Sequence, residues 1–183
     1  MDDSVFHHLY ETYHHDVFNF LTYLTKNRQL AEDLSHEVYV KAIRAYSSFE
    51  GRSSEKTWLF AIAKNVSIDY FRKTKVRSKH DATFFDWDKD DLKSTDKTPE
   101  QQSIDNEQMR SVFEKLDSCT LDQRLVIIMR YFNDLSISDT AEVLGWSEGK
   151  VKTTQHRALK SLRTKVSLAE LERGEPSGSR TKR

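Results

Sequence analysis

Glycine and proline are scarce in this chain, which has five Gly and two Pro among 183 residues. Both residue types interrupt regular structure, and an alternation of apolar and polar residues, as in a half-buried strand, nowhere runs for six residues. These absences argue against a β-rich fold. The sequence therefore predicts a chain that is nearly all helix.

Cysteine and long apolar runs are also nearly missing. The single cysteine, Cys119, has no partner for an internal disulfide, which fits a reducing compartment, and we interpret it as a packing residue. No apolar run approaches the ~20 residues of a membrane span. The acidic start, Met1 to Ser4, lacks the basic and apolar regions of a secretory signal. We expect a cytoplasmic protein.

The formal net charge is zero, but the charge is unevenly distributed along the chain. Residues 81–107 hold nine Asp or Glu against three Lys, whereas residues 150–183 hold ten Lys or Arg against three Glu. Such segregation predicts an electrostatic role for the basic end, and polyanions are the first candidates for its partner.

Apolar residues at three- and four-residue steps predict three helices in the first part of the chain. The first spans Val5 to Leu24, the second runs from Leu30 to about Tyr46, and the third carries Trp58 to Tyr70. Between the second and third helices, Phe49 to Ser54 has the composition of a turn. We expect these helices to enclose one core that ends near residue 79.

Periodicity is lost in the acidic stretch that follows and returns near Ile104. Thr120 and Gln123 have the spacing of a capping box at the start of the next apolar helix. We predict an all-α fold of two small helical domains, residues 1–80 and 105–166, joined by a flexible acidic linker, residues 81–104. Within the linker, Phe84 to Trp87 is apolar enough to dock on a partner surface, and residues 167–183 form a polar, disordered tail.

A helix-turn-helix is predicted from Ser136 to Arg163. Ser136 would cap a short helix that ends at Leu144, Gly145 would take the left-handed conformation, and Ser147 would cap a second helix. A small residue, Ala141, stands where the second helix crosses most closely. This spacing is typical of helix-turn-helix proteins.

The second helix of this motif has a basic, polar outer side. At 100° per residue, Val151, Ala158 and Leu162 fall on one side and the charged residues fall opposite. Such a side, beginning at a helix N-terminus, suits the major groove of DNA. We predict base-edge contacts from Thr153, His156 and Arg157, and phosphate contacts from lysines and one arginine: Lys150, Lys152, Lys160 and Arg163.

The third helix interleaves basic and aromatic residues from Trp58 to Lys79. Aromatic rings stack on unpaired bases while Lys and Arg follow the backbone, so this mixture favours single-stranded DNA. For Trp58 itself we favour core packing.

Three motifs together resemble the extracytoplasmic-function (ECF) sigma factors of bacterial RNA polymerase. They are AEDLSHEVYVKA at residues 31–42, WLFAIAKNVSIDYFRK at 58–73, and the helix-turn-helix that contains VKTTQHRALKSLR. The stretches GRSSEKTW, FDWD and VKTTQHR are most similar to the sigma-X type of bacilli. The resemblance covers both helical blocks in the family's order.

This resemblance implies sites in both domains. The second domain would read the minus-thirty-five element with Lys150, Lys152, Thr153, Thr154, His156, Arg157 and Lys160. The first would read and melt the minus-ten element with Arg52, Lys56, Lys64, Asn65, Asp69, Arg72 and Lys73. It would bind the polymerase β′ clamp helices through Asp33, Leu34, His36, Glu37 and Tyr39. Thr154 and Gln155 replace a frequent Arg-Leu pair, so the promoter sequence is not predicted.

The implied partners are core RNA polymerase, through its β′ clamp helices and β flap, promoter DNA, and a cognate anti-sigma factor. No small-molecule substrate, cofactor, metal or membrane insertion is expected, and the protein would not be an enzyme. About 25 linker residues reach ~80 to 90 Å when extended, enough for two sites two DNA turns apart.

Two other classes of function stay open from the residues alone. A stand-alone helix-turn-helix regulator with a helical sensor domain would bind duplex DNA without polymerase. An enzyme with a metal site is suggested by the pairs His7-His8 and His14-His15 together with His36, but no carboxylate or Cys cluster completes a ligand set.

Overall fold

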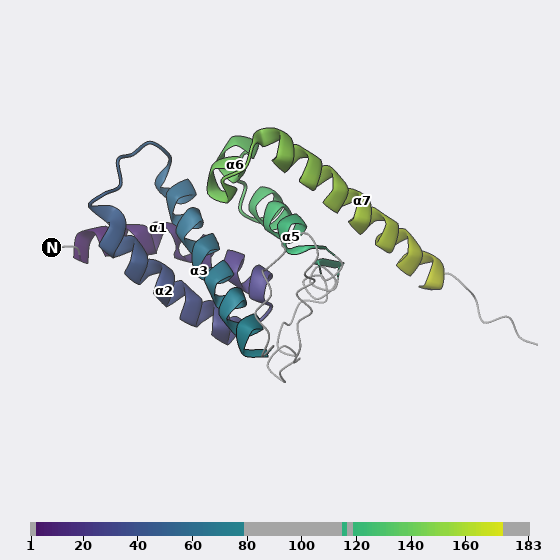
Figure 1. Cartoon of the computed structure of the whole chain (residues 1–183), viewed down its shortest axis with the longest axis horizontal. Helices are drawn as coiled ribbons and strands as arrows, with labels where there is room; N and C mark the ends of the chain where they lie inside the picture. Colours follow the sequence, from purple (N-terminus) through teal and green to yellow (C-terminus); the bar gives the residue numbers. More distant parts are fainter. Residues whose placement is uncertain (1–2, 79–114, 117–118, 174–183) are drawn as a thin grey trace, which may run out of the picture.

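The computed structural model describes residues 3–78, 115–116 and 119–173, and all regular elements in these ranges are helical (Figure 1). The predicted all-α fold is confirmed for this part of the chain. The linker (residues 81–104) with its Phe84 to Trp87 segment lies outside the described residues, as do residues 174–183 and all but residues 115–116 of the helix expected from Ile104 to Leu116. Residues 167–173, which were expected to belong to the disordered tail, instead continue the last helix, α7 (Glu148–Arg173).

Three long helices form the N-terminal module: α1 (Asp3–Thr25), α2 (Arg28–Tyr46) and α3 (Glu55–Ser78). The start of α2 is fixed by Asn27, whose side-chain oxygen accepts a hydrogen bond from the Leu30 N–H at 3.0 Å. At the start of α3, the Ser54 hydroxyl accepts from the Thr57 N–H, also at 3.0 Å. Both caps satisfy amide groups that have no partner inside the helix.

The core of this module is aromatic as well as aliphatic. Phe20 of α1 and Phe60 of α3 are fully buried, with ring centroids 5.3 Å apart. The loop between α2 and α3 is closed by a contact between tilted rings, since the ring centroids of Phe49 and Trp58 lie 5.0 Å apart. Trp58 is therefore a packing residue, as its sequence context favours, and Gly51 makes the turn with φ +67°.

The C-terminal module contains α5 (Leu121–Ile127), the π-helical turn η2 (Ile128–Phe132), α6 (Ile137–Leu144) and α7 (Glu148–Arg173). The capping box of Thr120 and Gln123 is present as predicted. The π-helical turn is not visible in the sequence pattern. It lets the Leu135 N–H reach back to the Met129 carbonyl at 3.0 Å, which turns the chain towards α6.

The two modules touch each other, and their buried apolar side chains form one continuous cluster. Tyr23 of α1 packs on Phe132, with ring centroids 4.4 Å apart. Beside this contact, the buried Asn133 side chain donates to the Asp16 carbonyl at 3.1 Å. α6 lies against α3, so the second module covers one side of the first (Figure 1).

Candidate nucleic-acid interface

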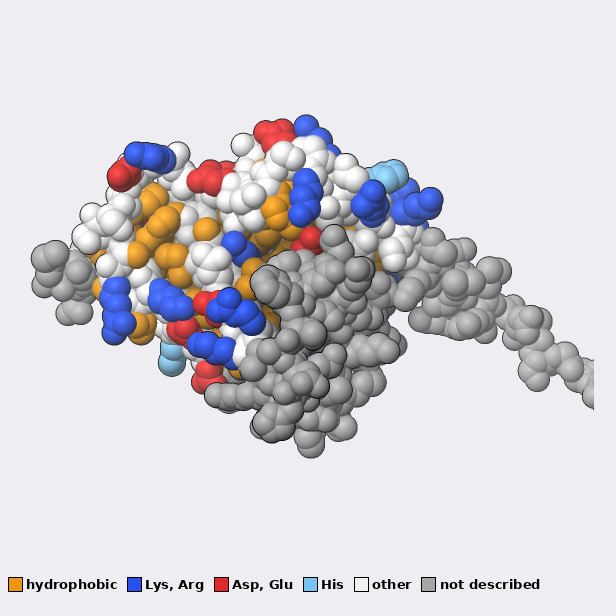
Figure 2. Space-filling model, viewed as in Figure 1, with side chains coloured by type: hydrophobic (Ala, Val, Ile, Leu, Met, Phe, Trp, Pro, Cys, Tyr) orange, Lys and Arg blue, Asp and Glu red, His pale blue; other side chains and the backbone are white. Residues whose placement is uncertain are grey.

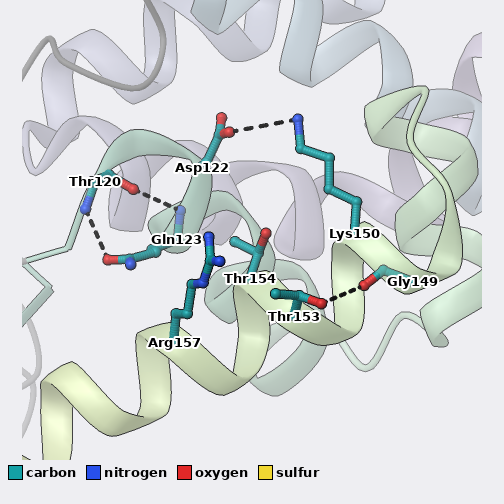
Figure 3. A pocket seen from close by; sticks show the side chains of 8 residues that line it. All are labelled: Thr120, Asp122, Gln123, Gly149, Lys150, Thr153, Thr154 and Arg157. Atoms are coloured by element: carbon teal, nitrogen blue, oxygen red, sulfur yellow. Dashed lines mark hydrogen bonds and ion pairs between the residues drawn. The ribbon is translucent and has the colours of Figure 1, made fainter.

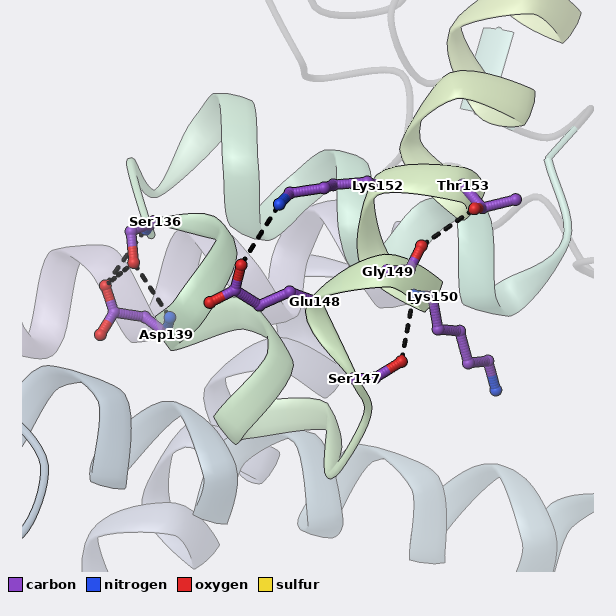
Figure 4. A network of polar contacts seen from close by, with 8 residues as sticks. All are labelled: Ser136, Asp139, Ser147, Glu148, Gly149, Lys150, Lys152 and Thr153. Atoms are coloured by element: carbon purple, nitrogen blue, oxygen red, sulfur yellow. Dashed lines mark hydrogen bonds and ion pairs between the residues drawn. The ribbon is translucent and has the colours of Figure 1, made fainter.

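The turn between α6 and α7 has the geometry of a helix-turn-helix. Ser136 caps α6 because its hydroxyl accepts a hydrogen bond from the Asp139 N–H at 3.0 Å, and the Asp139 carboxylate accepts one from the Ser136 N–H at 3.2 Å. α6 ends at Gly145, which is left-handed with φ 67° and ψ 34°. Ser147 then accepts from the Lys150 N–H at 3.3 Å and begins α7 (Figure 4). Each of these positions was predicted from the sequence.

One side of α7 is packed against the rest of the module. Val151 and Ala158 are fully buried. Gln155 lies on the same side, where its amide accepts from Arg130 Nε at 3.3 Å and donates to the Tyr131 hydroxyl at 3.0 Å. Gln155 therefore holds α7 on η2, and its amide faces away from the outer side of the helix.

The opposite side of α7 is exposed to solvent. Figure 2 shows Lys and Arg side chains, with a His among them, gathered over this helix. Of the seven residues predicted to read the minus-thirty-five element, Thr154 is half-buried and the other six are exposed: Lys150, Lys152, Thr153, His156, Arg157 and Lys160. The structure thus brings these seven residues together on one helix.

Two of these side chains are engaged with their own helix. The Thr153 hydroxyl donates to the Gly149 carbonyl at 2.9 Å, so its methyl group and its acceptor lone pairs are what it offers outward. Lys152 pairs with Glu148 at 3.3 Å, four residues earlier (Figure 4). An exposed pair of this kind is weak and is readily exchanged for a phosphate.

A polar hollow of about 550 Å³ lies between α7 and the first turn of α5. The Arg157 side chain points into it, towards Gln123, while the Lys150 side chain reaches towards Asp122 (Figure 3). Lys150 Nζ lies 4.0 Å from Asp122 Oδ2. The outer side of α7 therefore continues onto α5, which was not among the residues predicted to form this surface.

The minus-ten residues on α3 divide into two groups. Asn65, Arg72 and Lys73 are exposed, and Asp69 pairs with Arg72 at 3.1 Å with both side chains in contact with solvent. These four lie on the outer part of the helix. Arg52, in the loop before α3, is highly exposed and pairs with Glu50.

Lys56 and Lys64 are turned towards packed parts of the module. Lys56 Nζ lies 2.7 Å from Asp16 Oδ2 on α1. Lys64 is half-buried, and this loss of solvent lowers the pKa of its ammonium group. The structure does not place these two lysines with Asn65 and Arg72.

The predicted polymerase-binding residues on α2 also divide. Asp33, His36 and Glu37 are exposed. Leu34 and Tyr39 are 4% and 3% exposed, and burial raises the pKa of the Tyr39 phenol. Their apolar bodies pack in the core, so direct polymerase contact by Leu34 and Tyr39 stays a prediction that requires these side chains to become exposed. Val40, three residues after Glu37, is 47% exposed and adds an apolar side chain to this exposed part of α2.

Comparison with known families assigns both modules. Residues 9–77 match the model of sigma-70 region 2, and residues 112–162 match that of sigma-70 region 4. The chain is 46% identical to the ECF RNA polymerase sigma factor SigX of Bacillus subtilis, over 91% of this chain and 86% of the relative. The chain belongs to the ECF sigma-factor family.

Other relatives support the same assignment. RNA polymerase sigma factor YlaC of Bacillus subtilis is 35% identical to this ECF sigma factor over 82% of this chain and 85% of the relative. Among solved structures, CnrH in complex with the cytosolic domain of CnrY has the same fold, with a TM-score of 0.67, 17% identity and coverage of 91% and 90% of the two chains. The sigma factor RpoE in complex with the anti-sigma factor NepR, from Bartonella quintana, gives a TM-score of 0.62 at 25% identity, over 82% and 89%.

The described part of this ECF sigma factor has neither a metal-binding cluster nor a membrane-spanning helix. Within residues 3–78, 115–116 and 119–173, no group of three or more His, Cys, Asp or Glu is placed to hold a metal ion. His14 and His36 lie near each other between α1 and α2, and burial together with neighbouring histidines lowers the pKa of His14. No helix in these ranges is long and apolar enough to cross a membrane.

Proposed function

We propose that this protein binds core RNA polymerase and directs it to promoters by reading the minus-thirty-five element with α7 and by melting the minus-ten element with the N-terminal module. The observation that carries the proposal is the exposed outer side of α7 in a helix-turn-helix of the sigma-70 region 4 family. A helix presented in this way enters the major groove with its first turns at the base edges.

At the minus-thirty-five element, Thr153, His156 and Arg157 are the proposed base readers. Thr153 offers a methyl group and an acceptor, which suit thymine and base amino groups, and Arg157 is suited to guanine. Thr154 borders the same hollow. Lys152 and Lys160 are proposed to meet phosphates.

At the minus-ten element, the proposed contacts are the exposed residues Arg52, Asn65, Asp69, Arg72 and Lys73. Polar and basic groups on one part of α3 suit an unpaired strand, whose capture offsets the cost of opening the duplex. Lys56 would join these contacts only once its ion pair with Asp16 of the same module is broken, and Lys64 only once its half-buried side chain becomes exposed. Polymerase contact is assigned to Asp33, His36 and Glu37, with Leu34 and Tyr39 supporting that surface from below.

Further proposals rest on the family. The solved structures of CnrH and RpoE are complexes with CnrY and with the anti-sigma factor NepR, which supports a cognate anti-sigma factor as a partner of this chain. The protein acts in the cytoplasm as an initiation factor, and the chemistry of RNA synthesis belongs to the polymerase.

The test is run-off transcription with purified core polymerase on a library of promoters. We expect specific transcripts that depend on both promoter elements, and no tight duplex binding by the isolated protein. Tight, specific binding of the isolated protein to duplex DNA in a gel shift, together with no transcripts, would instead support a stand-alone regulator.

A further inference from the structure

The Lys150 side chain connects three segments of the C-terminal module. Its ammonium nitrogen lies 3.9 Å from the centre of the Trp146 ring and 4.0 Å from Asp122 Oδ2. Trp146 belongs to the turn of the helix-turn-helix, and Asp122 belongs to the first turn of α5. Lys150 itself lies in the first turn of α7, so these contacts fix the beginning of the recognition helix against the two segments beside it.

The surroundings of Lys150 favour a held side chain. The face of an indole ring attracts a cation, and 3.9 Å is a close approach. The Asp122 side chain is 14% exposed, so solvent and salt screen its attraction for Lys150 less than at an open surface. Lys152 differs because its partner, Glu148, lies on the same helix and both side chains are more than half exposed.

The position of Asp122 also calls for an explanation. It lines the hollow that Thr153 and Arg157 share, on the surface proposed to meet DNA (Figure 3). A carboxylate there repels the phosphates of a nearby duplex. An acidic residue at this place is consistent with DNA binding if its effect on the position of α7 outweighs that repulsion.

We propose that Lys150 is a positioning residue: held by Asp122 and Trp146, it sets the angle at which α7 presents Thr153 and Arg157 to the major groove. This inference rests on the proposed reading of the minus-thirty-five element by α7. It replaces, for Lys150, the phosphate contact that the sequence suggests. Trp146 and Asp122 thereby contribute to promoter selection through the position of α7.

The experiment measures binding of the holoenzyme to promoter DNA at several salt concentrations. The variants are Asp122→Asn, Lys150→Met and the double variant. We expect each single change to weaken DNA binding about 3- to 10-fold. The double variant should bind DNA at least as tightly as the single variant with the lower affinity, because both changes break the same Lys150–Asp122 contact. The slope of log affinity against log salt should equal that of the wild type.

Two results would overturn the inference. A phosphate contact contributes about 0.9 to the salt slope, so a slope reduced by about one in Lys150→Met assigns that residue to a phosphate. Tighter binding by Asp122→Asn would show that the carboxylate only opposes DNA. Unchanged thermal midpoints of the variants establish that the fold is intact, and Asp122→Ser serves as a second variant if Asp122→Asn lowers the midpoint.

The matched controls are Lys150→Arg and Lys152→Met. Arg keeps both the contact with the ring and the ion pair, so binding should stay within about twofold of the wild type. Lys152→Met removes a nearby charge whose partner, Glu148, lies on the same helix. Because this pair is separate from the Lys150–Asp122 contact, its effect on DNA binding should add to that of Asp122→Asn. If the wild-type holoenzyme ignores the minus-thirty-five sequence, the proposed function itself fails. If it discriminates and Lys150→Met lowers the slope, only the positioning role fails.

Discussion

The hydroxyl of Thr57 donates a hydrogen bond to Oδ1 of Asp139 with 3.1 Å between the oxygens, and it thereby joins the two modules across 82 residues of sequence. Thr57 lies in the first turn of α3, and Asp139 is the residue whose carboxylate completes the capping box of α6. Hydrogen bonds from Ser136 and Thr57 hold the pKa of Asp139 below its usual value. One carboxylate therefore serves both a helix start and the contact between modules.

Replacing Thr57 tests the strength of this contact. Thr57→Val keeps the shape of a side chain that is 2% exposed and removes the donor. We expect the free energy of unfolding to fall by about 1 to 2 kcal/mol, because a partly buried carboxylate oxygen loses a hydrogen bond. Urea denaturation measures this free energy of unfolding. Thr12→Val, at an exposed position of α1, should change the value by less than about 0.5 kcal/mol.

Gly145 and Gly149 offer a pair of substitutions with opposite expected signs. At Gly145 an added Cβ meets nothing within 4 Å, so the cost of Gly145→Ala, about 1 kcal/mol, comes from the left-handed backbone alone. Gly149 is the second residue of α7 and has an ordinary backbone, so Gly149→Ala should stabilise the protein by about 0.5 kcal/mol, the lower end of the value for a helix interior. Thermal unfolding of both variants checks the prediction, and equal shifts in one direction would contradict it.

The environment of Lys26 predicts that the free energy of unfolding rises at alkaline pH. Burial, with the Arg124 charge nearby, lowers the pKa of Lys26 from 10.5 to about 8. Between these values the unfolded chain binds more protons than the folded protein, so the free energy of unfolding increases as pH rises. The increase is of order 1 kcal/mol once solvent screening of this half-buried group is allowed for.

Lys26→Met is the variant that checks this dependence. It keeps the length of the side chain and removes the titration. Urea denaturation between pH 7.5 and 10 should show a smaller increase for the variant than for the wild type, and parallel curves would show that Lys26 titrates normally.

Arg157 and Arg72 should separate the two steps of promoter use. Loss of a good base contact costs ~1 to 3 kcal/mol, so Arg157→Ala should lose discrimination among minus-thirty-five sequences about 5- to 100-fold and keep strand opening. Arg72→Ala should keep upstream discrimination and lose opening. Run-off transcription and permanganate reactivity of unpaired thymines measure the two steps. Unchanged behaviour of both variants would refute the site assignments.

Local signals in the sequence determined a large part of the fold. Gly145 after Leu144, and the spacing of Thr120 and Gln123, each specify a helix end through contacts within a few residues. Such features need no knowledge of the rest of the chain. The outer side of α7 was predictable for the same reason, because the helical period alone separates Val151 from Arg157.

Long-range packing explains what the sequence did not reveal. Lys56 is paired with Asp16 of α1 and Lys64 is half-buried, and the helical period of α3 alone shows neither. The same holds for Leu34 and Tyr39, which share a helix with exposed residues. The π-helical turn at Ile128–Phe132 and the link from Lys150 to Asp122 depend on how separate helices meet.

Packing of α6 on α3 bears on how this protein chooses where to act. Promoter elements two turns apart are about 70 Å from each other, whereas Thr57 and Asp139 are within hydrogen-bond distance. Binding both elements at once requires the two modules to separate. A DNA sequence that resembles only one element must therefore compete with the contact between α6 and α3. We expect polymerase and two correctly spaced elements together to overcome this contact, so that a single chance match is a poor target.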